Sequence, residues 1–196
     1  GRPSSFFGNG CVAHVSLAHP VGPNLQKRIA NAAEAEGIAV HRGGTYVCME
    51  GPQFSSLAES KSYKAQGFDV IGMTNMPEAK LAREAEMCYA TVAMVTDYDC
   101  WHPGHDHVTV EAVVKVLLAN ADKARELVRR AVPKLGRRAA SCDKGCHTAL
   151  EYAIITHPAK RSPAMTRKLA AVAGRVLNAG KTGKTKKASG KKGKGR

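Results

Sequence analysis

Cys88-Tyr-Ala-Thr-Val-Ala-Met-Val-Thr96 is a run with almost no strongly polar side chain, and it indicates the fold class. Such a run predicts a strand that is buried on both faces, because a strand with one solvent-exposed face would alternate apolar and polar residues. Strands of this kind belong to sheets that helices cover on two sides. Outward from the run, strands alternate with helices, which predicts an α/β class chain with a three-layer α/β/α domain.

The flanking elements follow from periodicity and from glycine, proline and capping residues. We expect strands at 12–15, 38–41, 45–49 and 69–73, and helices at 24–36, 55–67, 78–87, 108–132, 151–156 and 165–177. Pro77 is expected in the first turn of its helix, and Pro133 is expected to stop the long helix before it. We predict one domain over residues 1–179.

Charge separates this domain from a C-terminal tail. Of the formal net charge of +14, eight positive charges lie in residues 180–196, which leaves +6 for residues 1–179. The tail has no acidic and no large apolar residue, so we predict that it is disordered. Two roles for it remain open, which are solubility and weak, salt-sensitive binding of nucleic acid.

Six cysteines are spread through the chain rather than clustered in a short disulfide-rich segment. We expect neither a signal peptide nor a transmembrane stretch, so no membrane partner is predicted and a reducing cytoplasm is the expected location. Cys142-Asp-Lys-Gly-Cys146-His147 was considered as a zinc site, but no second ligand pair lies at a suitable spacing. The favoured interpretation is that these are ordinary cysteines, buried or at a helix start, and we assign no metal.

Two carboxylates leave the apolar run together. Asp97 and Asp99 are two residues apart in extended chain, so their side chains point the same way, at a strand end where α/β domains bind ligands. Such a pair suits the edge of a 6-aminopurine, with one carboxyl group donating to N7 and the other accepting from the amine. An Asp-rich loop that caps the next helix is the alternative.

Two further motifs follow predicted strands. In residues 50–60, a Gly-Pro turn leads to Phe54, which could stack on a base, and to serines that could bond it; a hydrophobic staple with helix caps is the alternative. In residues 71–78, backbone amides and a threonine hydroxyl lie at a helix start, which favours anions such as phosphate. A buried strand followed by a capped helix would look the same.

Residues 50–60, 69–78 and 96–101, in this order and spacing, resemble the trimeric purine nucleoside phosphorylases, and within them the members that cleave S-methyl-5'-thioadenosine. The resemblance extends from about residue 6 to about residue 133. It implies the nucleoside phosphorylase fold and cleavage of methylthioadenosine by phosphate to adenine and 5-methylthioribose 1-phosphate. It also implies a homotrimer, phosphate as cosubstrate, and no metal or organic cofactor.

The resemblance further implies a role for each matching residue around the base. Asp97 corresponds to the catalytic acid that protonates purine N7, and Asp99 to the group that accepts from the 6-amino group. Phe54 corresponds to the aromatic residue that stacks on the base, and Ser55 to a specificity position beside it. A 6-oxopurine or methylthioinosine substrate is the alternative, although the relatives that act on 6-oxopurines carry an asparagine in this loop.

The same resemblance assigns the sugar and phosphate side. Met73 corresponds to a residue under the ribose, and Thr74 to a phosphate contact. Val110 and Val113 correspond to the apolar pocket of the 5'-methylthio group, and His14 to a histidine that reaches a neighbouring subunit's pocket. Members of the family begin with a glycine-rich phosphate loop and an Arg-His pair, and neither precedes Phe6. We therefore expect a fold that is incomplete at the N-terminus and residues 1–196 alone to be inactive.

Overall fold

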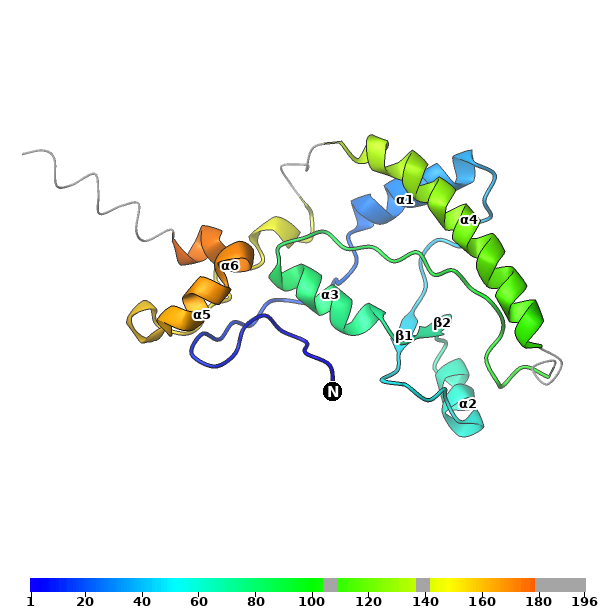
Figure 1. Ribbon diagram of the computed structural model, residues 1–196, viewed down its shortest axis with the longest axis horizontal. Helices are drawn as coiled ribbons and strands as arrows, with labels where there is room; N and C mark the ends of the chain where they lie inside the picture. Colours follow the sequence, from blue (N-terminus) through cyan, green and yellow to red (C-terminus); the bar gives the residue numbers. More distant parts are fainter. Residues whose placement is uncertain (104–108, 137–141, 179–196) are drawn as a thin grey trace, which may run out of the picture.

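The computed structural model describes residues 1–103, 109–136 and 142–178. The lysine-rich segment 180–196, with the nucleic-acid role considered for it, lies outside the described residues. The boundary between a domain at 1–179 and a tail is therefore a prediction that the structure leaves untested. Figure 1 shows the described elements in chain order.

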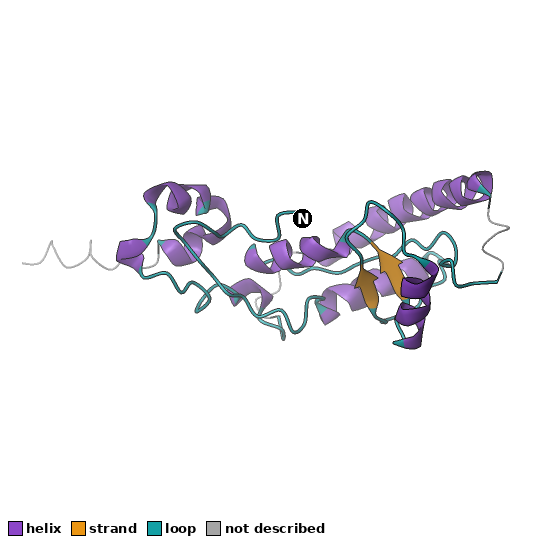
Figure 2. Ribbon diagram, turned by 90° about the horizontal axis from the view of Figure 1, so that it is seen from below, coloured by secondary structure: helices purple, strands orange, loops and turns teal. Residues whose placement is uncertain are grey.

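A parallel pair of strands provides the edge on which the candidate site lies. β1 (Tyr46–Cys48) pairs with β2 (Val70–Gly72), with Tyr46 opposite Val70 and Cys48 opposite Gly72. Because the strands are parallel, both chains leave the sheet at the same edge. The strands expected at 45–49 and 69–73 are thus confirmed in shorter form. Figure 2 shows them side by side, with the helix that connects them next to the sheet.

This connecting helix, α2 (Leu57–Ala65), begins as its sequence predicts. The Ser56 side chain accepts from the backbone N–H of Glu59 at 3.3 Å, and the Glu59 carboxylate accepts from the Ser56 N–H at 2.8 Å. These reciprocal bonds form a capping box and satisfy two amides that the helix leaves unpaired. Gly67, with φ of 74°, follows the helix and allows the reversal into β2.

After β2 the chain enters α3 (Asn75–Glu84), which has a kink at its start. Met76 has extended backbone angles inside the helix, as expected of a residue that precedes a proline. The regular part therefore begins at Pro77, as predicted, but the helix ends at Glu84, three residues before the expected position. Glu86 has a left-handed φ of 54°, so the backbone has already left the helix there.

Two long helices pack together on one side of the molecule. α1 (Pro23–Ala35) and α4 (Val110–Leu135) lie side by side and share a small core, which consists of Ala32, Ala33, Leu127 and Ala131. Pro133 does not stop α4, which continues to Leu135. Arg28 donates to the carbonyls of Lys134 and Leu135, and these bonds satisfy the end of the helix.

The C-terminal part is helical but differs in detail from the expectation. The single helix expected at 165–177 consists of α5 (Pro163–Lys168) and α6 (Ala170–Leu177), and the short 3₁₀ helices η2 (Cys146–Thr148) and η3 (Pro158–Lys160) precede them. The helix expected at 151–156 is absent, because Ile154 pairs with Ala13 in an isolated bridge. The strand expected at 12–15 is reduced to that bridge.

The larger core joins this C-terminal part to the start of the chain. Its buried members lie on the N-terminal segment, on the turn after η2 and on α5–α6, and they are Phe7, Cys11, Leu150, Ala153, Leu169, Ala173 and Leu177. The end of α3 ties the two segments together. The Glu84 carboxylate accepts from the Phe6 N–H at 2.7 Å, and that of Glu86 accepts from the Leu150 N–H at 3.0 Å.

The run 88–96 contradicts the prediction of a doubly buried strand. Among the described residues no strand pairs with it, and Val92 and Val95 are 44% and 60% exposed. A strand is stabilised by a ladder of backbone hydrogen bonds to a neighbouring segment, and among the described residues this run has only isolated bonds, such as that from the Gly22 N–H to the Tyr89 carbonyl at 2.8 Å. The run 38–41 is also irregular rather than a strand. Among the described residues, no helix is long and apolar enough to cross a membrane.

Candidate functional site

The candidate site lies where the chain leaves β1 and β2. Gly51 follows β1, and Met73 follows β2. A side chain at Gly51 would come within 2.6 Å of the Met73 sulfur, and the φ of Gly51 is +67°, so only glycine fits there. The close approach of these two loops fixes Met73 at the carboxyl edge of the strands, where α/β domains bind ligands.

Asp99 is the best-anchored of the predicted base-reading residues. One carboxylate oxygen accepts from the hydroxyl of Ser60 at 2.6 Å, and the other accepts from the backbone N–H of Cys100 at 2.8 Å. Ser60 is fully buried on α2. The helix that follows β1 thus holds the 97–101 segment against the strand edge, although the two are far apart in the sequence.

Asp97 lies two residues earlier and is exposed. One oxygen of its carboxylate accepts from the hydroxyl of Thr96 at 2.7 Å, which restrains the side chain. The two carboxylates therefore differ. Asp99 is fixed by the protein as an acceptor, and Asp97 remains accessible to a ligand.

Phe54 and Ser55 lie beside the same segment. The Cys100 thiol donates to the Ser55 carbonyl at 3.8 Å, and the Ser55 hydroxyl contacts the Met49 sulfur at 3.5 Å. Phe54 is 87% exposed, so it is not buried as the hydrophobic staple that was considered for it. An exposed aromatic ring next to Ser55 in the chain is available to stack on a planar ligand.

Thr74 is exposed at the start of α3, and its side chain makes no capping bond there. The next residue, Asn75, accepts from the hydroxyls of Tyr89 at 2.8 Å and Thr91 at 2.6 Å. These bonds connect the start of α3 to the chain that runs toward Asp97. The structure therefore groups Thr74, the predicted phosphate contact, with the loops around Met73.

Three predicted residues lie outside this group. Val110, at the start of α4, is 74% exposed, and Val113 is partly buried. His14 is exposed, and its backbone N–H donates to Ala153 at 2.9 Å, so it belongs to the opposite, C-terminal part of the molecule. The described residues do not join these three side chains to the base-reading group.

The sequence analysis missed the residues that hold the 97–101 segment. Ser60 is one, and its signal is a small hydroxyl on the covered face of α2. Lys64 is another, because its ammonium group lies 3.3 Å from the centre of the Trp101 ring. Tyr98 stacks on His102 with ring centres 4.4 Å apart. Together these contacts shape the loop beyond the two carboxylates.

Comparison with known proteins supports this interpretation. The sequence model described as "Phosphorylase superfamily" matches residues 1–133. Over 176 residues the chain is 65% identical to S-methyl-5'-thioadenosine phosphorylase of Bradyrhizobium diazoefficiens and 64% identical to that of Rhodospirillum rubrum. In both comparisons 90% of this chain is aligned, and the chain spans about 60% of the relative's length.

Solved structures agree with the sequence relatives. A methylthioadenosine phosphorylase from an antarctic soil metagenomic library matches with a TM-score of 0.79 at 45% identity, over 87% of this chain and 60% of that one. An adenosine/methylthioadenosine phosphorylase mutant of Schistosoma mansoni, in complex with methylthioadenosine, matches with a TM-score of 0.65 at 32% identity, over 71% of this chain and 55% of that one. The α/β nucleoside phosphorylase fold predicted from sequence is thereby confirmed, and the chain belongs to the phosphorylase superfamily.

Proposed function

We propose that the protein containing this chain cleaves S-methyl-5'-thioadenosine with phosphate, giving adenine and 5-methylthioribose 1-phosphate. The observation that carries the proposal is the pair of carboxylates at the strand edge, of which Asp99 is fixed by Ser60 and Asp97 is accessible. The relatives named as methylthioadenosine phosphorylases support the same reaction. Because the chain spans about 60% of their length, the activity is proposed for the whole protein.

In this proposal the two carboxyl groups have different roles. Asp99 accepts a hydrogen bond from the 6-amino group, and Asp97 donates a proton to N7 as the bond from C1' to N9 breaks. Protonation stabilises the negative charge that develops on the leaving purine. General acid catalysis of this kind contributes roughly 10²–10⁴-fold to the rate. Phe54 stacks on the purine, and Ser55 lies beside it.

Phosphate is the cosubstrate, and no organic cofactor enters the reaction. Its oxygen attacks C1' while the purine leaves, so the configuration at C1' is inverted. Thr74 contacts phosphate at the start of α3, where backbone amides and the helix dipole favour an anion. Met73 packs under the ribose. The contact between Met73 and Gly51 supports this placement, because it fixes the methionine at the strand edge.

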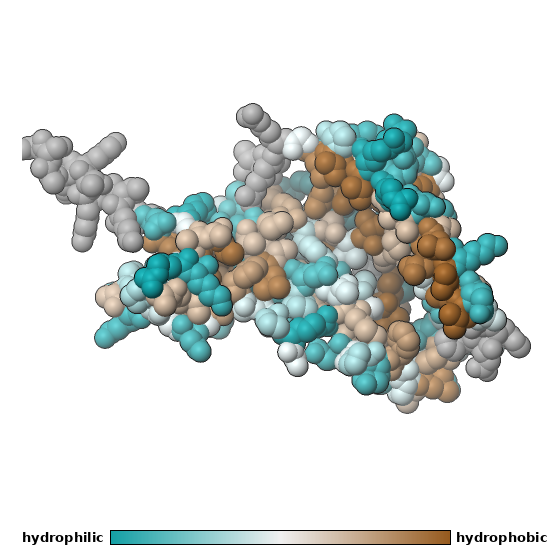
Figure 3. Space-filling view, in the orientation of Figure 1, coloured by the Kyte–Doolittle hydropathy of each residue, from teal (hydrophilic) through white to brown (hydrophobic). Residues whose placement is uncertain are grey.

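We further propose that the protein is a homotrimer located in the cytoplasm. Exposed apolar side chains follow one face of α4, which is typical of an interaction surface, and Figure 3 shows them gathered along this helix. Val110 and Val113 would line the 5'-methylthio pocket, and the exposed His14 would reach the pocket of a neighbouring subunit. The six cysteines are spread through the chain rather than clustered in a short disulfide-rich segment, which is typical of proteins of a reducing compartment.

The test of the reaction is adenine release from methylthioadenosine, with and without phosphate. It uses the whole protein that contains residues 1–196, and we expect adenine release that depends on phosphate. Absence of phosphate-dependent release by the complete protein would refute the proposed reaction.

Two further measurements test the roles of the carboxylates. Asp97→Asn should lower kcat by roughly 10²–10⁴-fold with the fold unchanged by circular dichroism. Near-normal turnover would remove its role as acid. Rates on inosine and methylthioinosine are the second measurement. A 6-oxopurine presents an acceptor to the Asp99 carboxylate, so a clear preference for these substrates would refute the assignment of the base.

A further inference from the structure

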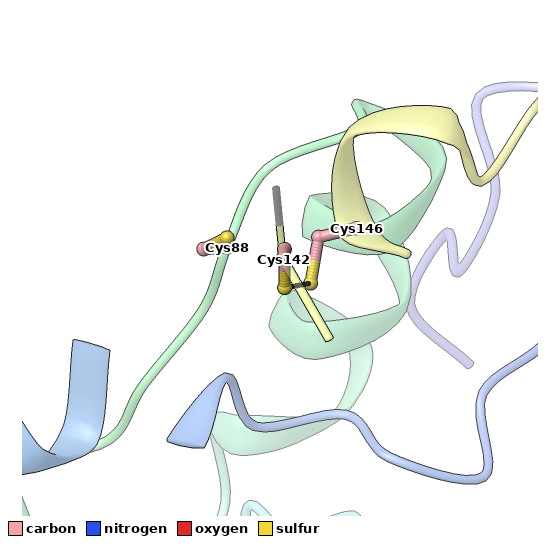
Figure 4. Close-up of side chains that lie close together, drawn as sticks. All are labelled: Cys88, Cys142 and Cys146. Carbon is pink, nitrogen blue, oxygen red and sulfur yellow. Dashed lines mark hydrogen bonds between the residues drawn. The ribbon is translucent and has the colours of Figure 1, made fainter. Parts of the chain in front are cut away.

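Three thiols from distant parts of the sequence meet on the side of the molecule away from the candidate site. The sulfurs of Cys88, Cys142 and Cys146 all lie within 4.8 Å of one another, and those of Cys142 and Cys146 are 3.3 Å apart. Cys88 follows α3, and the other two flank the turn that precedes η2. Figure 4 shows the thiols of Cys142 and Cys146 in contact, with Cys88 on a neighbouring segment of the same chain.

The turn that carries two of these thiols is held in place by the protein. The Gly145 N–H donates to the Cys142 carbonyl at 2.7 Å, and Gly145 adopts a left-handed φ of 61°. The guanidinium of Arg83, which is 4% exposed, donates to the Lys144 carbonyl at 2.8 Å and also to the carbonyl of His19. The thiols are thus positioned by a preformed loop rather than by chance contact of mobile side chains.

Charge and proton affinity in the cluster are uneven. Burial raises the pKa of Cys146 to about 12, and the neighbouring thiols of Cys142 and Cys88 reinforce the shift. Burial acts in the same direction at Cys142, but hydrogen bonds from the loop backbone and from the other two thiols lower the pKa of Cys142 to about 7. The positive charge of Arg83 acts on the cluster and favours thiolate.

The spacing suits a thiophilic cation. Zinc binds thiolate sulfur at about 2.3 Å, which places the sulfurs of a tetrahedral site about 3.8 Å apart. The sulfurs of Cys142 and Cys146 are 3.3 Å apart, and no pair of the three sulfurs is more than 4.8 Å apart, so all separations lie within about 1 Å of that value. Small rotations of the side chains are therefore enough to bring the three sulfurs to one ion. Soft thiolate ligands select zinc over magnesium or calcium.

We propose that Cys88, Cys142 and Cys146 form a zinc site with three thiolate ligands. The net charge of such a centre is negative, and the adjacent Arg83 offsets it. The site would join Cys88, inside the part that matches the family model, to the segment beyond residue 133, outside that match. Its role is structural, because it fastens the C-terminal segment to the end of α3. Neither the base-reading residues nor the proposed reaction is involved.

Sequence spacing could not predict this site. Cys142 and Cys146 offer two ligands, and the third lies more than fifty positions earlier in the chain. Only the fold brings Cys88 to the turn. A disulfide between Cys142 and Cys146 is the competing chemistry, since it would use the same two sulfurs, and the test must therefore keep the thiols reduced.

The experiment titrates zinc into the full chain, reduced with a phosphine, against a chromophoric zinc chelator, and counts bound zinc by native mass spectrometry. We expect one zinc per chain and a rise in Tm. Cys88→Ser, Cys142→Ser and Cys146→Ser should each weaken binding by more than about tenfold. Cys100→Ser, which removes a thiol outside the cluster, should bind zinc like the parent chain.

Cobalt binding to the parent chain is a second measurement, and it does not depend on whether the serine variants fold. Three thiolate ligands produce strong sulfur-to-cobalt charge-transfer absorption, and we expect this band to appear with one equivalent of cobalt. Failure of the reduced parent chain to bind zinc would overturn the proposal. Cobalt binding without the charge-transfer band would also overturn it, because the ion would then be held by other ligands.

Discussion

Apolar side chains are buried in the larger core, which joins the C-terminal part to the start of the chain, but they are exposed on the outer face of α4. Leu150 and Leu169 are 0% and 1% exposed, and segments from both ends of the chain enclose them. On α4, Val110 is 74% exposed and Leu118 is 62% exposed, although both belong to the apolar pattern that predicted the helix. In the first region, packing within the chain removes the apolar side chains from water, whereas in the second region they remain in contact with water.

The difference follows from what each region packs against. α4 buries Leu127 and Ala131 against α1, and this contact covers only one part of a helix of 26 residues. Of the residues that the resemblance assigns to the substrate, Val110 and Val113 lie on α4, and Asp97 and Asp99 directly follow the run 88–96. The packed region therefore supplies stability, and the open region is where we propose the ligand and subunit contacts.

The largest expected effect comes from breaking the packed region. Leu150→Ala should destabilise the chain by about 3 kcal/mol, because a fully buried leucine leaves a cavity. Leu118→Ala is the matched control on α4, and it should change stability by no more than about 0.5 kcal/mol. Urea unfolding of both variants provides the measurement. Equal costs at the two positions would contradict the contrast between the regions.

The next effect concerns the polar link between the packed region and α3. The Glu86 carboxylate accepts from the Leu150 N–H at 3.0 Å and from Arg175 at 2.6 Å, and Glu86 is 7% exposed. Glu86→Ala should cost about 2 kcal/mol, since it leaves a buried amide unpaired, while the half-exposed Arg175 remains solvated. Arg175→Ala should cost less. Thermal unfolding of the two variants would show which is less stable. If Arg175→Ala were the less stable variant, the ion pair would contribute more to stability than the hydrogen bond to the buried amide.

A smaller effect tests how the open region is held. Ser60→Ala removes the hydroxyl that donates to Asp99 and should cost about 1 kcal/mol. In the complete protein it should raise KM for methylthioadenosine more than it lowers kcat, because Asp99 loses its fixed orientation. Ser62→Ala, an exposed change on the same helix, serves as the control. If the two variants have the same KM, Ser60 has no positioning role.

The smallest effect concerns the start of α2. Hydrogen bonds from the Ser56 backbone and side chain lower the pKa of Glu59, against the opposing effect of desolvation. A carboxyl group whose pKa is lowered in the folded state stabilises the fold above its ordinary pKa, and this contribution is lost as the pH falls through the lowered value. Glu59→Gln should therefore flatten the acid side of the stability profile. The measurement is the free energy of unfolding in urea at several values from about pH 3 to about pH 6, the range in which carboxyl groups titrate. The same pH dependence in Glu59→Gln and in the parent chain would refute the link between the pKa of Glu59 and stability.

Local chemistry allowed the sequence to predict several features correctly. Ser56 and Glu59 predict the start of α2, Pro77 predicts the regular start of α3, and the strands around residues 47 and 71 occur where β-rich runs meet turns. These features depend on residues a few positions apart, so the sequence contains all the information needed. The family resemblance likewise rested on short motifs, and the match over residues 1–133 confirmed it.

The sequence by itself determined the two paired strands, the capped start of α2 and the presence of two carboxylates at i and i+2. Only the tertiary structure decided that the run 88–96 is not a sheet strand, that Ser60 fixes Asp99, and that Cys88 meets Cys142 and Cys146. The physical reason is that burial and side-chain bonding depend on which distant segments pack together. Local propensity sets what a segment can form, and its neighbours in space determine what it does form.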